Sequence, residues 1–228
     1  MSKIKNILKE IITIILETIY YRDSKCLCCN NEIYNRDYLC RKCRKKMNLY
    51  SETFFIKDKY NIKCYTCDVY SSIMRNLILK LKYSKKFFVA EFFSKIICNR
   101  IKDENLNIDL VTFVPSSRKR EKKRGYNQAE IIAKYSAKEV NKKCIGLLRK
   151  DGETKDQIGL DFHSRRRNVK KAFKIKKCFG LHKDYIVGKK ILIIDDVITT
   201  GATGYNCAEA LLDYGAKEVF IMALAKAN

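Results

Sequence analysis

The chain of 228 residues lacks an apolar run long enough to cross a membrane. The best candidate, Ile4 to Ile19, is interrupted by Lys9, Glu10 and Glu17 before it reaches the roughly 20 apolar residues that a span needs. Its apolar residues recur at helical spacing instead, which predicts an amphipathic helix packed on its own protein, with peripheral contact to the inner membrane as a further option. No small-residue cleavage site follows, so a secretory signal is the less favoured interpretation.

Histidine and proline are almost absent, with His163, His182 and Pro115 as the only examples. Neither histidine lies in a recognisable catalytic pattern, and no other side chain stands out as a general base. We therefore expect both histidines to be surface residues.

Acidic residues are few: 25 Asp and Glu stand against 48 Lys and Arg, for a formal net charge of +23. An excess of this size favours a polyanionic partner such as nucleic acid. Lysine is nevertheless spread along almost the whole chain together with abundant Ile and Asn. A compositional bias of the gene is therefore the alternative explanation.

The length and the 46% of hydrophobic residues predict one globular domain with a small appendage. Apolar runs alternate with helical patterns from Tyr70 onward, which is typical of an α/β domain with a parallel sheet flanked by helices. We expect helices over Ser71–Leu81, Phe87–Ile101 and Ala129–Val140, and strands over Ile62–Tyr70 and Asp109–Pro115. The predicted division is a first part, 1–55, with the amphipathic helix and a cysteine module, and a second part, 60–228, with the α/β domain.

Eleven cysteines occur, seven of them between Cys26 and Cys67. Because no cleavable export signal precedes them, zinc in a reducing cytosol is favoured over disulfides, and we expect a cytoplasmic protein. Two C-x-x-C turns supply four thiolates for a closed, structural zinc site. The predicted ligands are Cys26, Cys29, Cys40 and Cys43.

Three further cysteines leave alternatives open. Cys28 can replace one ligand of the first turn, and spacing alone does not decide between them. Cys64 and Cys67 form another C-x-x-C, but an extended strand directs these two side chains to opposite faces. We favour buried or surface thiols there over a second zinc site.

The most informative stretch is ILIIDDVITTGAT, residues 191–203. Its first four residues, Ile191 to Ile194, are all apolar and predict a strand buried on both faces. Asp195 and Asp196 follow at the expected end of that strand. The small residues Thr199–Thr203 then lead into a predicted helix, where backbone N–H groups can surround an anion. This pattern predicts a site for a phosphorylated sugar.

A basic loop is expected after the strand that ends at Pro115. Residues 118–124 carry six positive charges against one negative charge and lead into Gly125, Tyr126, Asn127 and Gln128. Ligands of doubly wound sheets bind at the carboxyl ends of the strands. We therefore expect this loop and the Asp195 loop to face the same crevice.

Residues 191–203 resemble the signature of type I phosphoribosyltransferases that binds phosphoribosyl pyrophosphate (PRPP). Further short motifs extend the resemblance from Cys26 to Ala225, and their order is similar to that of the ComF family of competence-associated proteins. These motifs are Lys80 to Tyr83, Arg124 to Gln128, Thr154 to Gln157, Arg165 to Asn168 and Ala172-Phe173. The family pairs a four-cysteine zinc module with a phosphoribosyltransferase-type domain.

The resemblance implies roles for particular residues. Asp195 and Asp196 would hold the ribose hydroxyls, and Thr199, Thr200, Gly201, Ala202 and Thr203 would hold the 5′-phosphate. Displacement of pyrophosphate requires cations and Mg²⁺ to neutralise the leaving group. Lys82, Arg120 and Arg124 are the candidates for that catalytic role, with Arg165 and Arg166 as weaker ones.

Two functions compete at this point. The first is a PRPP-binding protein that assists single-stranded DNA through natural transformation together with competence proteins, as the family resemblance implies. Basic residues suited to DNA are Arg165, Arg166, Arg167, Lys170 and Lys171. The second is an active phosphoribosyltransferase on an unidentified nitrogen nucleophile. A nucleobase salvage enzyme is less favoured, because such an enzyme has no need for a zinc module.

Overall fold

The computed structural model describes residues 25–33, 37–47, 50–83, 87–151, 173–176 and 181–227. The chain divides into two units, Met1–Lys45 and Lys46–Asn228. The sequence-based division at 1–55 and 60–228 stays a prediction. The predicted helix from Ile4 to Ile19 lies outside the described residues. Within the described ranges, no helix combines the length and the apolar character that a membrane crossing requires.

The first unit contains a tight turn and a short helix. Lys25 and Glu32 form an isolated bridge that closes the turn, and Asn30 takes a left-handed conformation with φ 62°. The Asn30 backbone N–H donates to the carbonyl of Cys26 at 2.9 Å, and the Cys26 N–H donates to the carbonyl of Asn31 at 2.8 Å. Helix α2 (Arg41–Lys46) follows; Cys40 directly precedes it and Cys43 lies in its first turn.

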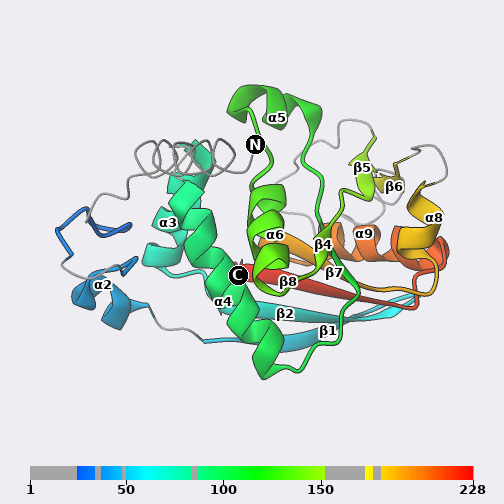
Figure 1. Ribbon diagram of the computed structural model, residues 1–228, viewed down its shortest axis with the longest axis horizontal. Coiled ribbons are helices and arrows are strands. Elements are labelled where there is room, and N and C mark those ends of the chain that lie inside the picture. Colours follow the sequence, from blue (N-terminus) through cyan, green and yellow to red (C-terminus); the bar gives the residue numbers. More distant parts are fainter. Residues whose placement is uncertain are drawn as a thin grey trace, which may run out of the picture. The chain divides into compact units, whose positions relative to one another are not determined.

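Six strands of the second unit form its central sheet, in the order β1-β2-β8-β7-β3-β4. Their bounds are β1 (Thr53–Lys57), β2 (Asn61–Val69), β3 (Leu110–Phe113), β4 (Lys143–Cys144), β7 (Lys190–Ile198) and β8 (Glu218–Lys226). Only the β1–β2 pairing is antiparallel among these neighbours. The predicted α/β fold with a mostly parallel sheet is confirmed (Figure 1).

Helices cover both faces of this sheet. Helices α4 (Phe87–Asp103) and α6 (Gln128–Glu139) lie on one face, where α3 (Ser72–Tyr83) packs on α4, and α9 (Ala202–Asp213) lies on the other (Figure 1). Successive strand residues point to opposite faces. Ile191 and Ile193 of β7 accordingly share a core cluster with Cys207 and Ala208 of α9.

Three smaller elements complete the described part. Strands β5 (Leu148–Lys150) and β6 (Phe173–Ile175) form a separate antiparallel pair, and α8 (Leu181–Ile186) precedes β7. Phe173 of β6 is buried in the core cluster that also contains Cys207 and Ala208 of α9.

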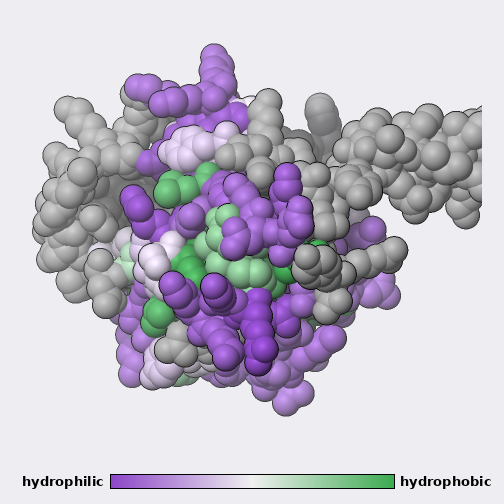
Figure 2. Space-filling view, turned by 90° about the vertical axis from the view of Figure 1, so that its left-hand side faces the viewer, coloured by the Kyte–Doolittle hydropathy of each residue, from purple (hydrophilic) through white to green (hydrophobic). Residues whose placement is uncertain are grey.

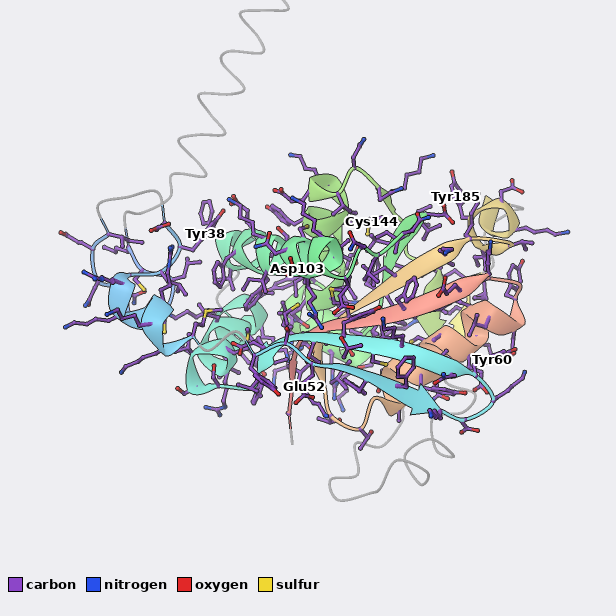
Figure 3. All side chains as sticks on the ribbon, turned by 90° about the horizontal axis from the view of Figure 1, so that it is seen from below. Tyr38, Glu52, Tyr60, Asp103, Cys144 and Tyr185 are labelled. Carbon is purple, nitrogen blue, oxygen red and sulfur yellow. The ribbon has the colours of Figure 1, made fainter. Side chains whose placement is uncertain are left out.

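The β1–β2 hairpin is fastened to the end of α9. Tyr60 lies at the tip of the hairpin (Figure 3), and its hydroxyl donates to Asp213 at 2.7 Å. Lys59 pairs with the same carboxylate at 2.6 Å, and the Tyr205 hydroxyl accepts the backbone N–H of Tyr60 at 2.9 Å. These contacts hold β1 against the helix that begins at the predicted phosphate loop.

Two sequence-based expectations were wrong. The basic segment 118–124 is a helix, α5 (Arg118–Arg124), rather than a loop. The Ser117 hydroxyl accepts the Arg120 N–H at its start, and Gly125 ends it in a left-handed conformation, so both ends are capped. Asp195 and Asp196 do not follow β7 but lie within it, because parallel pairing with β8 continues to Ile198.

The third C-x-x-C lies in a strand, as predicted. Cys64 and Cys67 of β2 are 0% and 3% exposed. Burial raises the pKa of each thiol to about 12. Both are therefore buried neutral thiols at neutral pH.

Candidate functional site

The two acidic residues of β7 point to opposite faces of the sheet. Asp195 has the same orientation as Ile191 and Ile193, and its charge acts on Cys207 of α9. Asp196 forms an ion pair with Lys82 at the end of α3. The strand therefore delivers one carboxylate toward the helix that starts at the phosphate loop, and the other toward a cation on the α3 face.

These carboxylates share an environment that disfavours two negative charges. Burial, and then the neighbouring charge of Asp196, raise the pKa of Asp195 well above its ordinary value. Its Oδ1 accepts the backbone N–H of Asp196 at 2.8 Å, and Asp196 Oδ1 accepts that of Val197 at 2.8 Å. A cation or a hydroxyl donor brought by a ligand would stabilise the ionised form of Asp195.

Lys82 is the predicted cation that the fold brings into contact with the acidic pair. Its side chain is 21% exposed and that of Asp196 is 18% exposed, so the pair is mostly shielded from water yet accessible to a ligand. Lys82 and Asp196 are far apart in sequence and meet because α3 ends beside the carboxyl end of β7. A ligand that separates Lys82 from Asp196 would find a hydrogen-bond acceptor in the Asp196 carboxylate and a positive charge on Lys82.

The predicted phosphate loop, residues 199–203, leads from β7 into α9. Gly201 caps the helix with φ 78°, a conformation that favours glycine. A Cβ on Gly201 would lie 2.2 Å from Cδ1 of Ile56 in β1. Thr199 and Thr203 are exposed, and the first N–H groups of a twelve-residue helix face this loop. A glycine-capped helix start of this kind can bind an anion.

Helix α5 carries the other two predicted cations. Arg120 and Arg124 are separated by one turn and lie on the same side of the helix. Figure 2 shows hydrophilic residues at the top of the molecule, the level at which α5 lies in Figure 1, and also across the lower half of the same face. Arg124 Nη2 donates to the Tyr83 hydroxyl at 3.5 Å, and its guanidinium lies 5.3 Å from the centre of the Tyr83 ring. Since Tyr83 follows Lys82, the cations of α3 and α5 are neighbours.

The segment after α5 forms a junction whose roles the sequence reasoning missed. The Tyr126 hydroxyl donates to the carbonyl of Leu81, next to Lys82. Asn127 donates from Nδ2 to the Val114 carbonyl at 2.9 Å and accepts the Ala129 N–H at 3.0 Å, which caps α6. The sequence signal for this junction was Tyr126, Asn127 and Gln128, which directly follow the C-cap glycine of α5. The segment thus ties α3, β3 and α6 together.

Four cysteines of the first unit converge. The sulfurs of Cys26, Cys29, Cys40 and Cys43 all lie within 4.8 Å of one another. The Cys29 and Cys40 sulfurs are 3.7 Å apart, and tetrahedral zinc with sulfur at about 2.3 Å requires a separation of ~3.8 Å. The donor set therefore fits zinc and can bind it.

Electrostatics in this cluster favour a thiolate at one position. Burial opposes ionisation of Cys26, but the backbone N–H groups of Cys29, Cys40 and Cys28 outweigh it and lower the pKa of Cys26 to about 6. Burial raises the pKa of Cys43, with further contributions from the neighbouring thiols. A bound cation would be needed to ionise all four.

Other predicted residues lie outside the described part of the chain. These are the DNA candidates Arg165, Arg166, Arg167, Lys170 and Lys171. No side-chain statement applies to them or to His163 and His182.

No protein-family model matches the chain. It is 26% identical over 157 residues to competence protein F of Haemophilus influenzae, an alignment that covers 66% of this chain and 67% of that protein. The DNA utilization protein YhgH of Salmonella typhimurium is 24% identical over 226 residues (95% and 90% covered). Competence protein ComFC of Streptococcus pneumoniae is 23% identical over 225 residues (96% of each). These relatives confirm the resemblance to ComF-type competence proteins.

Solved structures with similarity to the chain are phosphoribosyltransferases. Adenine phosphoribosyltransferase from Thermoanaerobacter pseudethanolicus has a TM-score of 0.41 at 14% identity, with 82% of this chain and 98% of that chain covered. The glutamine PRPP amidotransferase from B. subtilis has a TM-score of 0.40 at 18% identity, with 59% and 25% covered.

Proposed function

We propose that this chain binds PRPP with Mg²⁺ and assists the handling of single-stranded DNA during uptake, a role suggested by the names of its relatives, which refer to competence and DNA utilization. The observation that carries the PRPP site is the Lys82–Asp196 ion pair next to the glycine-capped start of α9. A cation, two carboxylates and the predicted phosphate loop occur near the carboxyl end of one strand, which supports the proposal. That is the set of groups that a ribose with a phosphate at one end and pyrophosphate at the other requires.

Each part of PRPP finds a matching group in this arrangement. The N–H groups and hydroxyls of residues 199–203 would bind the 5′-phosphate. Asp195 and Asp196 would accept the ribose hydroxyls, and Lys82 and Arg124 would bind the pyrophosphate, with Arg120 one turn away. Carboxylate oxygens are ligands that Mg²⁺ prefers, and the ion would neutralise charge on the pyrophosphate.

Calorimetry with PRPP and Mg²⁺ tests this site. We expect the unmodified protein to bind and the Asp195→Asn, Asp196→Asn double variant to lose most of the affinity. The matched control is Asp103→Asn with Asp184→Asn, because it removes the same charge from exposed positions on α4 and α8. Equal affinity in the double variant and the control would show that the acids play no part.

The proposed zinc ion would be structural. A shell of four thiolates leaves no position for a catalytic water, and a unit of this size buries little apolar surface without a metal. Thiolates bound to zinc persist in a reducing compartment, so we place the protein in the cytoplasm. Metal analysis of the purified chain tests the zinc site: one zinc per chain is expected, and none after Cys26→Ser with Cys40→Ser.

DNA binding is proposed from the names of the relatives and from the excess of basic residues. The logarithm of the affinity for single-stranded DNA should fall with the logarithm of the salt concentration, at a slope of about 0.7 per phosphate contact. Replacing the five basic residues between Arg165 and Lys171 with alanine should reduce that slope by up to about 3.5. Replacement of Lys119, Lys122 and Lys123 on exposed α5 is the comparison. An unchanged slope in the first variant would contradict the assignment of these residues.

Catalysis is the second candidate function. The same residues would support phosphoribosyl transfer if a nitrogen nucleophile binds beside C1 of the ribose. A pyrophosphate-release assay with PRPP and pooled nucleobases, amines or DNA distinguishes the two functions. Release that depends on one acceptor would establish an enzyme, whereas PRPP binding without release would leave the ligand-binding function.

A further inference from the structure

The guanidinium of Arg124 is supported from two sides. Its Nη1 donates to Oε1 of Gln128 at 3.0 Å, and its Nη2 donates to the hydroxyl of Tyr83 at 3.5 Å. Tyr83 is 62% exposed, whereas Gln128 is only 4% exposed and sits in the first turn of α6. Gln128 is therefore the rigid support, and it determines where the charge of Arg124 is held.

The hydrogen bond to Arg124 fixes the orientation of the Gln128 amide. An arginine side chain only donates, so the Gln128 oxygen must face it. The amide nitrogen is bonded to the same carbon as this oxygen. Its N–H groups therefore point away from Arg124, although the nitrogen itself lies close to the guanidinium. Nε2 of Gln128 is buried and has no hydrogen-bond partner among the residues described. A buried donor without a partner is costly, and such groups mark places where a ligand or water completes the bonding.

The backbone around Gln128 adds to the rigidity. Asn127 caps α6 and is itself anchored to the carbonyl of Val114 at the end of β3. Gln128 thus projects from a fixed helix start at the carboxyl end of a central strand. This is the same edge of the sheet at which β7 presents Asp196 to Lys82.

We propose that Gln128 is a positioning residue for Arg124 and that its remaining amide N–H donates to an oxygen of the pyrophosphate group held by Arg124. The inference rests on the proposed function, since it takes PRPP as the ligand. It assigns to Gln128 two linked tasks: the oxygen orients the cation, and the nitrogen completes the anion site. Ribose 5-phosphate lacks the pyrophosphate, so its binding should depend on neither the oxygen nor the nitrogen of the Gln128 amide.

Calorimetry in the presence of Mg²⁺ with PRPP, pyrophosphate and ribose 5-phosphate tests the proposal on the full chain. Gln128→Met keeps the size and removes both polar atoms. We expect it to weaken PRPP and pyrophosphate binding at least about tenfold, because it removes one hydrogen bond to a charged group and also the support of Arg124, and to leave ribose 5-phosphate unchanged. Ser136→Ala is the control, because Ser136 is buried on the same helix and its hydroxyl also lacks a partner among the described residues.

Gln128→Glu separates the two tasks and guards against a failure of the methionine variant to fold. Its carboxylate still accepts from Arg124, but it cannot donate, and its charge opposes the anion. We expect pyrophosphate affinity to fall at least as far as in Gln128→Met. Pyrophosphate affinity equal to that of the unmodified protein would overturn the proposal.

A double-mutant cycle with Arg124→Met shows whether Gln128 acts through the arginine. If it does, Gln128→Met should weaken pyrophosphate binding less in the Arg124→Met background than alone, because only the direct hydrogen bond from the amide nitrogen is then left to lose. Full additivity, or an equal loss of ribose 5-phosphate, would overturn the inference while the proposed function stands. If the unmodified protein binds neither PRPP nor ribose 5-phosphate, the proposed function is overturned and this inference with it.

Discussion

Gly201 offers a direct test of how the phosphate loop is built. Its φ of 78° lies in the left-handed region, and an added Cβ would lie 2.2 Å from Cδ1 of Ile56. Gly201→Ala therefore carries two penalties, one for backbone conformation and one for the collision. The left-handed conformation costs an L-residue about 1–2 kcal/mol. Displacement of a packed side chain adds roughly 1–3 kcal/mol, so we expect a loss of about 2–5 kcal/mol in the free energy of unfolding.

Two further variants separate these penalties. Gly188 has φ 72° but nothing within 4 Å of its ideal Cβ, so Gly188→Ala should cost only the conformational part, about 1–2 kcal/mol. Ile56→Val removes Cδ1, the atom in the collision, and by itself should cost about 0.5–1.5 kcal/mol. Combined with Gly201→Ala, it should recover most of the steric part.

Urea denaturation followed by circular dichroism measures the free energies, and calorimetry with PRPP measures the site. We expect Gly201→Ala to weaken PRPP binding and Gly188→Ala to leave it unchanged, since only Gly201 lies at the start of α9. The reasoning would be refuted if both glycine variants lost the same stability. It would also be refuted if Ile56→Val and Gly201→Ala were simply additive, because the two side chains would then not meet.

Three other perturbations follow from the structure. Burial raises the pKa of Asp68, so the carboxyl keeps its proton to a higher pH in the folded protein than in the unfolded chain. Stability should therefore fall as pH rises from the unfolded pKa to the folded pKa. Asp68→Asn should make the melting temperature depend less on pH, and an unchanged dependence would contradict this. Tyr126→Phe removes the hydrogen bond to the Leu81 carbonyl beside Lys82, which should cost about 1 kcal/mol in chemical denaturation and weaken PRPP binding; retention of full affinity would argue against the junction. Removal of zinc by a chelator should make all four clustered thiols reactive toward a thiol reagent, and equal reactivity before and after chelation would argue against a metal.

Local sequence was enough for the parts of the site that neighbouring residues build. The run Ile191 to Ile194 had to be a buried strand because it is apolar on both faces, and the small residues after it had to be a turn at a helix start. The spacing of Cys26 with Cys29 and of Cys40 with Cys43 likewise identified the four thiols that converge. In the strand and loop, and within each C-x-x-C pair, the interacting groups lie within one turn of each other, and only ten residues separate the two pairs.

Local signals failed where pairing with a distant segment decided the outcome. Asp195 and Asp196 were expected beyond the strand, but β8 continues the hydrogen-bonding ladder past them, so the alternation of the strand separates them onto two faces. The basic segment was expected to be a loop, although Ser117 and Gly125 are suitable helix caps. The segment was interpreted as a loop because six of its seven residues are basic, and the two capping residues were not considered.

The sequence by itself determined the fold class, the small-residue loop at the start of α9 and the four-thiol cluster, because each is encoded in residue types at short spacing. Only the tertiary structure decided that Lys82 would meet Asp196 and that Gln128 would hold Arg124. The first meeting depends on where α3 ends relative to β7, and the second depends on the sharp turn between α5 and α6. Such contacts are set by the order of strands in the sheet and by the packing of helices on it, which no local pattern specifies.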